Sequence, residues 1–132
     1  MPQDDYIIKS FQVGKPKIIP KVWGFEEIIV NNRQYGYCGK ILNIKQGATM
    51  SVHLHLKKDE MFHVISGEVH LTILFQAAEK TFLLKSGDSF HIFPGLIHSL
   101  TGITDARIAE FSTFDEYHDS YRIKKSVGPD GQ

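Results

Sequence analysis

The chain has 132 residues, and its 15 basic and 15 acidic side chains give a formal net charge of zero. This length suits one domain with its own core, and the balanced charge argues against binding to nucleic acid or to an anionic membrane. The single cysteine, Cys38, excludes an internal disulfide and favours a reducing compartment, so we expect a cytoplasmic protein. No apolar run reaches the length of about 20 residues that a membrane span needs, and MPQDDYIIKS is unlike a secretory signal.

The apolar segments are short, rich in β-branched and aromatic residues, and separated by turn residues. EEIIVNNRQYGYCGKILNI predicts two strands around an Asn-Asn-Arg-Gln turn. EVHLTILF alternates as a strand does, QAAEK reads as a loop, and TFLLK as the next strand. SGDSFHIFPGLIHSL places turns on either side of a short strand, ARIAEFSTF predicts another strand, and a helical turn is expected within STFDEYHDSYRIKK. We therefore predict an all-β domain, a sandwich or a barrel, whose tail at about 126–132 is frayed.

The segment GATMSVHLHLKKDEMFHVISG, from Gly47 to Gly67, contains a candidate metal site. His53 and His55 are two residues apart, so in a strand they point to the same side. KKD reads as an exposed turn, and a hairpin there would bring Glu60 back beside the two imidazoles. Two neutral imidazoles and one carboxylate suit a divalent transition metal. The alternative is a pair of surface histidines on an edge strand.

The spacing of these residues, Gly-x5-His-x-His-x4-Glu-x6-Gly, matches the first cupin motif without a gap. GDSFHIFPGLIH resembles the second cupin motif, although the family usually has proline where Phe93 stands. The resemblance implies an all-β jelly-roll β-barrel, with one domain over 1–132 and a barrel core at about 20–115. It also implies that one metal ion is bound inside the barrel by His53, His55, Glu60 and His98.

These donors narrow the identity of the metal. Three nitrogens and one oxygen would saturate tetrahedral zinc, whereas an octahedral ion would keep two positions open. We therefore expect Mn, Fe, Co or Ni as the working ion, with Zn as the other candidate. The remaining histidines are expected to lie outside the metal site, as are the solvated turn Lys57–Asp59 and the small buried Cys38. Those histidines are His63, His70, His91 and His118.

A finer resemblance extends over about residues 20–123. KVWGFEEIIV, Lys40 and the positions of Glu110, Asp119 and Arg122 resemble the cupin domain of type II mannose-6-phosphate isomerases. This likeness implies a metal-dependent sugar or sugar-phosphate isomerase of carbohydrate metabolism. Glu110 is then the candidate base and Lys40 the residue that orients the sugar or its phosphate. A surface carboxylate and a solvated lysine are the alternatives for these two residues.

Three positions depart from the isomerase pattern. Ser99 stands where that family has an arginine that suits phosphate, Gly102 where it has asparagine, and His53 where it has glutamine. Arg107, Arg122 or Lys40 would have to replace the missing cation.

Two other functions stay open: an Fe(II)-dependent dioxygenase-type enzyme and a non-catalytic binder of a saccharide or carboxylate. By analogy with small cupins we expect a homodimer, with YIIKSF and KIIP as edge or partner-swapping strands.

Overall fold

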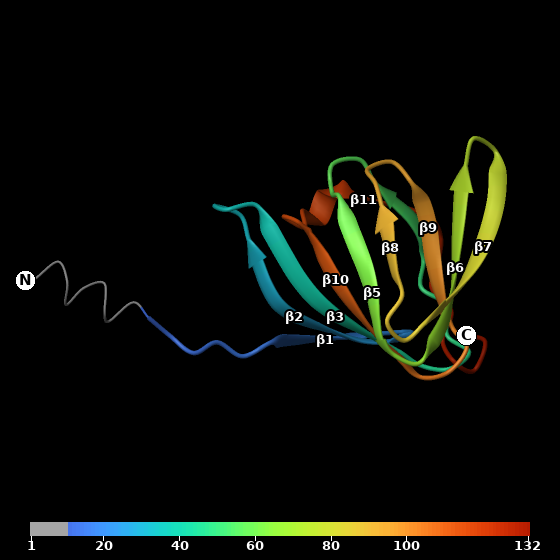
Figure 1. Cartoon of the computed structure of the whole chain (residues 1–132), viewed down its shortest axis with the longest axis horizontal. Coiled ribbons are helices and arrows are strands. Elements are labelled where there is room, and N and C mark those ends of the chain that lie inside the picture. Colours follow the sequence, from blue (N-terminus) through green and yellow to red (C-terminus); the bar gives the residue numbers. More distant parts are fainter. Residues whose placement is uncertain (1–10) are drawn as a thin grey trace, which may run out of the picture.

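The computed structural model describes residues 11–132, which form eleven strands and one short 3-10 helix, η1 (Figure 1). The elements are β1 (Lys17–Lys21), β2 (Gly24–Asn32), β3 (Tyr37–Ile44), β4 (Val52–His55), β5 (Glu60–Ser66), β6 (Glu68–Phe75), β7 (Ala78–Lys85), β8 (Ser89–Ile92), β9 (Ile97–Gly102), β10 (Ala106–Thr113), η1 (Tyr117–Asp119) and β11 (Ser120–Lys124). No helix in this part of the chain is long and apolar enough to cross a membrane.

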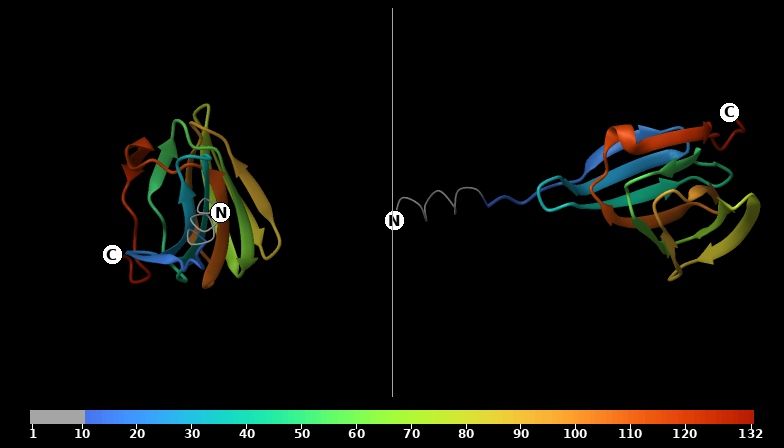
Figure 2. Two further views of the ribbon diagram at one scale, coloured as in Figure 1. Left: turned by 90° about the vertical axis from the view of Figure 1, so that its left-hand side faces the viewer. Right: turned by 90° about the horizontal axis from the view of Figure 1, so that it is seen from above.

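The strands form two antiparallel sheets that curve around a common interior (Figure 2). One sheet has six strands in the order β1-β2-β3-β10-β5-β8, and the other has five in the order β11-β4-β9-β6-β7. Inward-facing side chains of both sheets make the apolar core, among them Leu42, Phe62, Val64, Leu71, Leu100 and Ile108. This arrangement confirms the predicted all-β jelly-roll fold.

Alternating polarity predicted most strands correctly, and EVHLTILF coincides with β6. The loop expected at QAAEK is wrong, because β7 starts at Ala78 and pairs directly with Phe75. The two strands are joined by Gln76 and Ala77, which both have positive φ, 52° and 62°. A two-residue hairpin turn of this kind normally carries asparagine or glycine, so these residues gave no signal for it.

The C-terminal part of the chain is more ordered than the sequence indicated. The helical turn expected there is η1, but it leads into β11, which pairs with β4. The tail expected to fray is tied down by backbone hydrogen bonds in both directions between Thr49 and Val127, at 2.8 Å each. Of the two apolar segments expected at a sheet edge, KIIP lies in the edge strand β1. Apart from Phe11, YIIKSF lies outside the described residues.

The register of the strands brings the candidate site together inside the barrel. His53 of β4 lies opposite His98 of β9. In the other sheet, Glu110 of β10 lies opposite both Lys40 of β3 and Phe62 of β5. Residues that lie opposite one another in neighbouring strands point to the same face, so these side chains share the interior with the core.

Candidate metal centre

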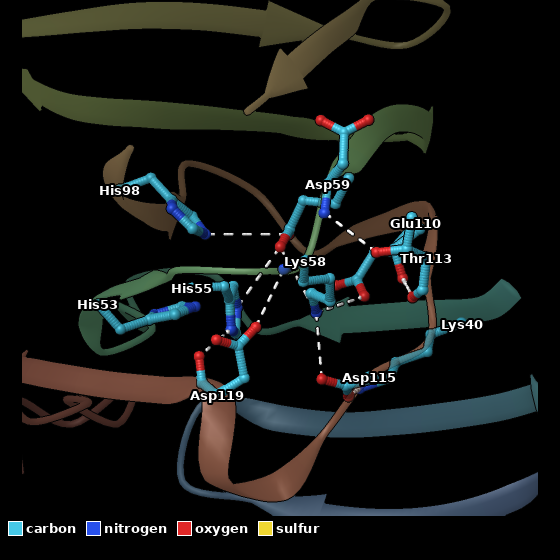
Figure 3. Close-up of polar contacts among 12 residues, drawn as sticks. Lys40, His53, His55, Lys58, Asp59, His98, Glu110, Thr113, Asp115 and Asp119 are labelled. Carbon is cyan, nitrogen blue, oxygen red and sulfur yellow. Dashed lines mark hydrogen bonds and ion pairs between the residues drawn. The ribbon is translucent and has the colours of Figure 1, made fainter. Parts of the chain in front are cut away.

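Three histidines meet at the barrel interior (Figure 3). One ring nitrogen of each of His53, His55 and His98 lies within 4.8 Å of those of the other two. All three side chains are buried, so the alternative of surface histidines on an edge strand is wrong. Their rings are separated by 4.4 Å to 5.9 Å between centroids.

Each of the three rings is oriented by a backbone carbonyl. Nδ1 of His53 donates to the oxygen of Ser51 at 2.8 Å, and Nδ1 of His98 donates to that of Leu96 at 2.9 Å. Nδ1 of His55 donates to the oxygen of Asp119 at 3.1 Å. Because a carbonyl oxygen only accepts, Nδ1 must carry the hydrogen and Nε2 keeps its lone pair. This is the tautomer in which an imidazole binds a metal through Nε2.

Glu60 lies beside these rings at the start of β5. Its Oε2 is 3.4 Å from Nε2 of His55, and its Oε1 is 3.8 Å from Nε2 of His98. Among the described residues, Oε2 of Glu60 and Nε2 of His98 are buried without a hydrogen-bond partner. Oε2 of Glu60 has an ion pair with Lys58 at 3.4 Å, but Nε2 of His98 has no such contact to a cation or donor in the described part of the chain. Since buried polar atoms in native proteins are nearly always satisfied, this nitrogen favours a ligand beside Glu60. The donor set therefore fits a divalent transition metal.

The protonation states favour the same ligand. Burial lowers the pKa of His53, His55 and His98 to about 4, so the rings are neutral at pH 7. Burial and the neighbouring charge of Glu110 raise the pKa of Glu60 to about 8, although Lys58 acts in the opposite direction. Neutral imidazoles are ready to bind a metal, and a buried carboxyl group that lacks enough positive charge gains most from one.

The prediction that Lys57–Asp59 form a solvated turn is wrong for Lys58, which is buried. Its side chain is only 3% exposed, and its Nζ lies 3.0 Å from Oε2 of Glu110 and 3.4 Å from Oε2 of Glu60. The cause is Asp119, whose carboxylate accepts hydrogen bonds from the backbone N–H groups of residues 56, 57 and 58 at 3.0–3.1 Å. These bonds curl the β4–β5 connection and turn Lys58 inward.

Lys40 and Glu110 are both buried, so the solvated lysine and the surface carboxylate are excluded. Nζ of Lys40 lies 2.5 Å from Oδ2 of Asp115 and 3.7 Å from Oε2 of Glu26. Burial opposes the ionisation of Glu110, but Lys58 and Lys40 outweigh it and lower the pKa of this carboxyl group. Glu110 is thus ionised at neutral pH, and its role as a base remains a prediction.

Asp115 is the residue that sequence reasoning missed altogether. It follows β10 and contacts both buried lysines, with Oδ1 lying 3.5 Å from Nζ of Lys58. Asp119 was singled out only through the isomerase resemblance, and its neighbour in space, Lys58, was assigned to solvent. No periodicity in the sequence marks these residues, because their contacts join segments about 60 residues apart.

The remaining candidates lie away from this cluster. Nδ1 of His63 forms a hydrogen bond with Oγ of Ser89 at 2.7 Å on the outer side of β5. His70, His91 and His118 are exposed. Arg107 points outward to Asn43 and Glu27, and Arg122 is exposed on β11. Ser99 donates to the carbonyl of Met50 at 2.8 Å. Among the described residues, the buried lysines are Lys40 and Lys58, and Lys58 is the one that contacts Glu60 beside the histidines.

Gly102 has no room for the asparagine of the isomerase pattern. A Cβ atom at this position would lie 2.6 Å from the carbonyl oxygen of Lys45 and 3.1 Å from that of Thr104.

A protein-family model described as Cupin domain matches residues 40–114, more than half of the chain. The chain therefore belongs to the cupin family.

Solved structures with the same fold include oxalate decarboxylase from Bacillus subtilis and the capsular polysaccharide assembling protein CapF from Staphylococcus aureus. The first has a TM-score of 0.72 at 17% identity, over 86% of this chain and 31% of that one. The second also has a TM-score of 0.72 at 17% identity, over 89% of this chain and 34% of that one. This chain thus spans about a third of each structure, and the likeness shows the fold alone. No curated protein matches the sequence significantly.

Proposed function

We propose that this cupin is a metal-dependent enzyme that moves a proton on a small, oxygen-rich substrate, of the sugar or sugar-phosphate isomerase type. One observation carries the proposal: the buried pair Lys58–Glu110, at 3.0 Å, adjoins the carboxylate Glu60 beside three neutral histidines. Metal-ligand side chains and a separate base are the two components that aldose–ketose isomerisation requires. The homodimer and the cytoplasmic location expected from the sequence belong to the same proposal.

His53, His55, His98 and Glu60 would hold one divalent ion, Mn, Fe, Co, Ni or Zn. When bound, the ion polarises the carbonyl and hydroxyl oxygens of the substrate. The backbone carbonyls behind the rings keep Nε2 of each histidine directed at the ion. Lys58 supplies a positive charge that contacts both Glu60 and Glu110.

Glu110 accepts the proton in this proposal. The ion pair with Lys58 keeps Glu110 ionised but also makes it a weaker base, because the same charge lowers its pKa. Proton acceptance therefore requires the Lys58 ammonium to shift toward other carboxylates. Glu60 and Asp115 lie within 3.4 Å and 3.5 Å of Nζ and can receive it.

Proton exchange in D2O tests the proposal. Metal-loaded protein is incubated with sugars and sugar phosphates, and NMR follows deuterium incorporation at C2. We expect Glu110→Gln to lower kcat/KM by about 10²–10⁴-fold, the usual effect of removing a general base, while the bound metal is retained. Oxygen uptake after anaerobic iron loading would instead show a dioxygenase. Tight binding without exchange or oxygen uptake would show a non-catalytic binder, and either result would overturn the isomerase proposal.

A further inference from the structure

Two buried lysines share one carboxylate next to the metal centre (Figure 3). Lys40 comes from β3 and Lys58 from the β4–β5 connection, and they are 7% and 3% exposed. Asp115 bridges them, with Oδ2 at 2.5 Å from Nζ of Lys40 and Oδ1 at 3.5 Å from Nζ of Lys58. An ammonium group removed from water needs an anion beside it. Among the described residues, Asp115 forms an ion pair with both lysines, whereas Glu26 pairs with Lys40 alone, and Glu60 and Glu110 pair with Lys58 alone.

Asp115 is held differently from the other acidic groups of the cluster. Glu60 and Glu110 lie on paired strands, and their side chains are 1% and 6% exposed. The Asp115 side chain is 23% exposed, and its residue lies in the segment between β10 and η1 that has no strand pairing. Its backbone is held by the Asn31 side chain, which accepts from the N–H at 2.9 Å and donates to the carbonyl at 3.0 Å. Rotation of the side chain therefore removes the carboxylate without breaking a sheet.

We propose that Lys40 and Lys58 form a carboxylate-binding subsite, which Asp115 fills until a carboxylate group of the ligand replaces it. Exchange of one carboxylate for another leaves the charge around the two lysines unchanged, whereas a neutral hydroxyl would remove the anion that they share. This subsite rests on the proposed function, because it names the substrate class of the same site. The substrate would be a small sugar acid or hydroxy acid with oxygen atoms at the metal and a carboxylate at the lysines.

The distance between the two parts of the site supports this substrate class. Lys58 contacts Glu60 at 3.4 Å and Asp115 at 3.5 Å, so one lysine separates the metal ligand from the exchangeable carboxylate. A ligand that reaches both parts needs only a few bonds between its two polar ends. The group displaced is planar and carries one charge, so the subsite favours carboxylate over the larger and more highly charged phosphate.

Acetate binding to Asp115→Ala tests the subsite. We expect acetate to bind this variant with an apparent Kd at least about ten-fold lower than in the wild type, and to raise its Tm saturably. Calorimetry and thermal unfolding are measured on manganese-loaded protein and again on metal-free protein. The matched control is Glu116→Ala, since Glu116 pairs with the exposed Lys57 at 3.2 Å; its acetate response should equal that of the wild type.

The double variant Lys40→Met with Asp115→Ala should lose the acetate response, which separates binding at the lysines from binding at the metal. An equal response in Asp115→Ala and the wild type, or tighter binding of inorganic phosphate than of acetate, would overturn the proposal. If Asp115→Ala does not fold, Asp115→Asn keeps the shape without the charge, and acetate should still bind it more tightly than the wild type. Failure to bind metal would overturn the proposed function instead, and the metal-free arm of the experiment distinguishes the two failures.

Discussion

Glu60 and Glu110 are two buried carboxyl groups that contact the same ammonium group, yet their surroundings drive their pKa values apart. Lys58 and Lys40 together lower the pKa of Glu110. Within residues 11–132, Lys58 is the one lysine that contacts Glu60, and burial together with the charge of Glu110 raises the pKa of Glu60 to about 8. Opposite shifts in neighbouring groups separate their roles: Glu110 is stabilised as a carboxylate by two lysines, whereas the single lysine beside Glu60 does not offset its burial.

Glu60→Gln should therefore lose the metal. An amide carries no negative charge, so we expect metal affinity to fall by more than the about 10–100-fold cost of losing an outer-shell partner. Calorimetric titration with Mn(II) and elemental analysis measure the change. Glu116→Gln, a surface substitution, should bind one ion as the wild type does, and a stoichiometric ion in Glu60→Gln would remove this residue from the ligand set.

The metal-free protein should be most stable near pH 6.5. The three histidines titrate at about 4 when folded and 6.5 when unfolded, so the unfolded state binds more protons below pH 6.5 and stability is lost as pH falls toward 4. Glu60 acts oppositely: its pKa is 4.5 when unfolded and about 8 when folded, so stability falls as pH rises through this range. Below pH 6.5 the three histidines change the free energy of unfolding more than Glu60 does, so the net effect of acid is to destabilise the protein.

Urea unfolding in the presence of a chelator, from pH 4.5 to 8, measures this curve. Addition of metal should remove the decline above pH 6.5, because Glu60 is then ionised against a cation. A curve that rises steadily to pH 8 without metal would show that Glu60 is already ionised there.

At the scale of elements, the β4–β5 connection depends on a residue about 60 positions further along the chain. The carboxylate of Asp119 accepts from three backbone N–H groups of this connection, and its own carbonyl orients His55. Asp119 itself is 4% exposed, so its contacts are shielded from water. One residue thus fixes a metal ligand and the inward direction of Lys58.

Asp119→Ala should leave these donors without an acceptor. Because an unsatisfied buried donor costs about 1–3 kcal/mol, we expect the free energy of unfolding to fall by about 2–4 kcal/mol. Metal affinity should also fall, by about 10–100-fold, as it does when an outer-shell partner is lost. Urea unfolding and Mn(II) titration measure both effects. Asp59→Ala changes an exposed carboxylate of the same connection and should alter neither; equal effects of the two substitutions would argue against the special role of Asp119.

The sequence predicted those parts of the fold and site that depend on local spacing. Strand alternation indicated that His53 and His55 share a face. It did not indicate the inward turn of Lys58, which follows from the distant Asp119, or the bridge that Asp115 makes between two lysines. The Gln76–Ala77 turn was also missed, because neither residue favours a positive φ. Contacts across long separations, and turns without their usual residues, leave no periodic pattern.

At the scale of the whole molecule, the six-stranded sheet presents apolar side chains on its outer face. Phe111 and Met61 lie opposite one another in β10 and β5 and are 60% and 37% exposed. These two side chains line a surface hollow with a volume of about 330 Å³, and Asp59 and His91 line it too. Exposed apolar surface of this kind favours association, and we assign the expected homodimer contact to this face.

If the expected homodimer forms through this face, Phe111→Lys should make the protein monomeric. The lysine would bury an unpaired charge at the middle of the contact, which destabilises the contact. The mass from light scattering after size-exclusion chromatography should therefore fall by half at micromolar concentration. Tyr117→Lys places the same charge at an exposed aromatic residue on η1 and should remain dimeric. A wild-type protein that is monomeric under these conditions would remove the assignment.

The pairing of β11 with β4 also sets an order of events during biosynthesis. All four candidate metal-binding side chains emerge from the ribosome before Asp119, which holds His55 and the adjoining loop in place. While the nascent chain is still short of that residue, its donors are present but not yet oriented, and β4 lacks its outer neighbour. We therefore expect the candidate metal site to become able to select an ion only after the last strand has been translated.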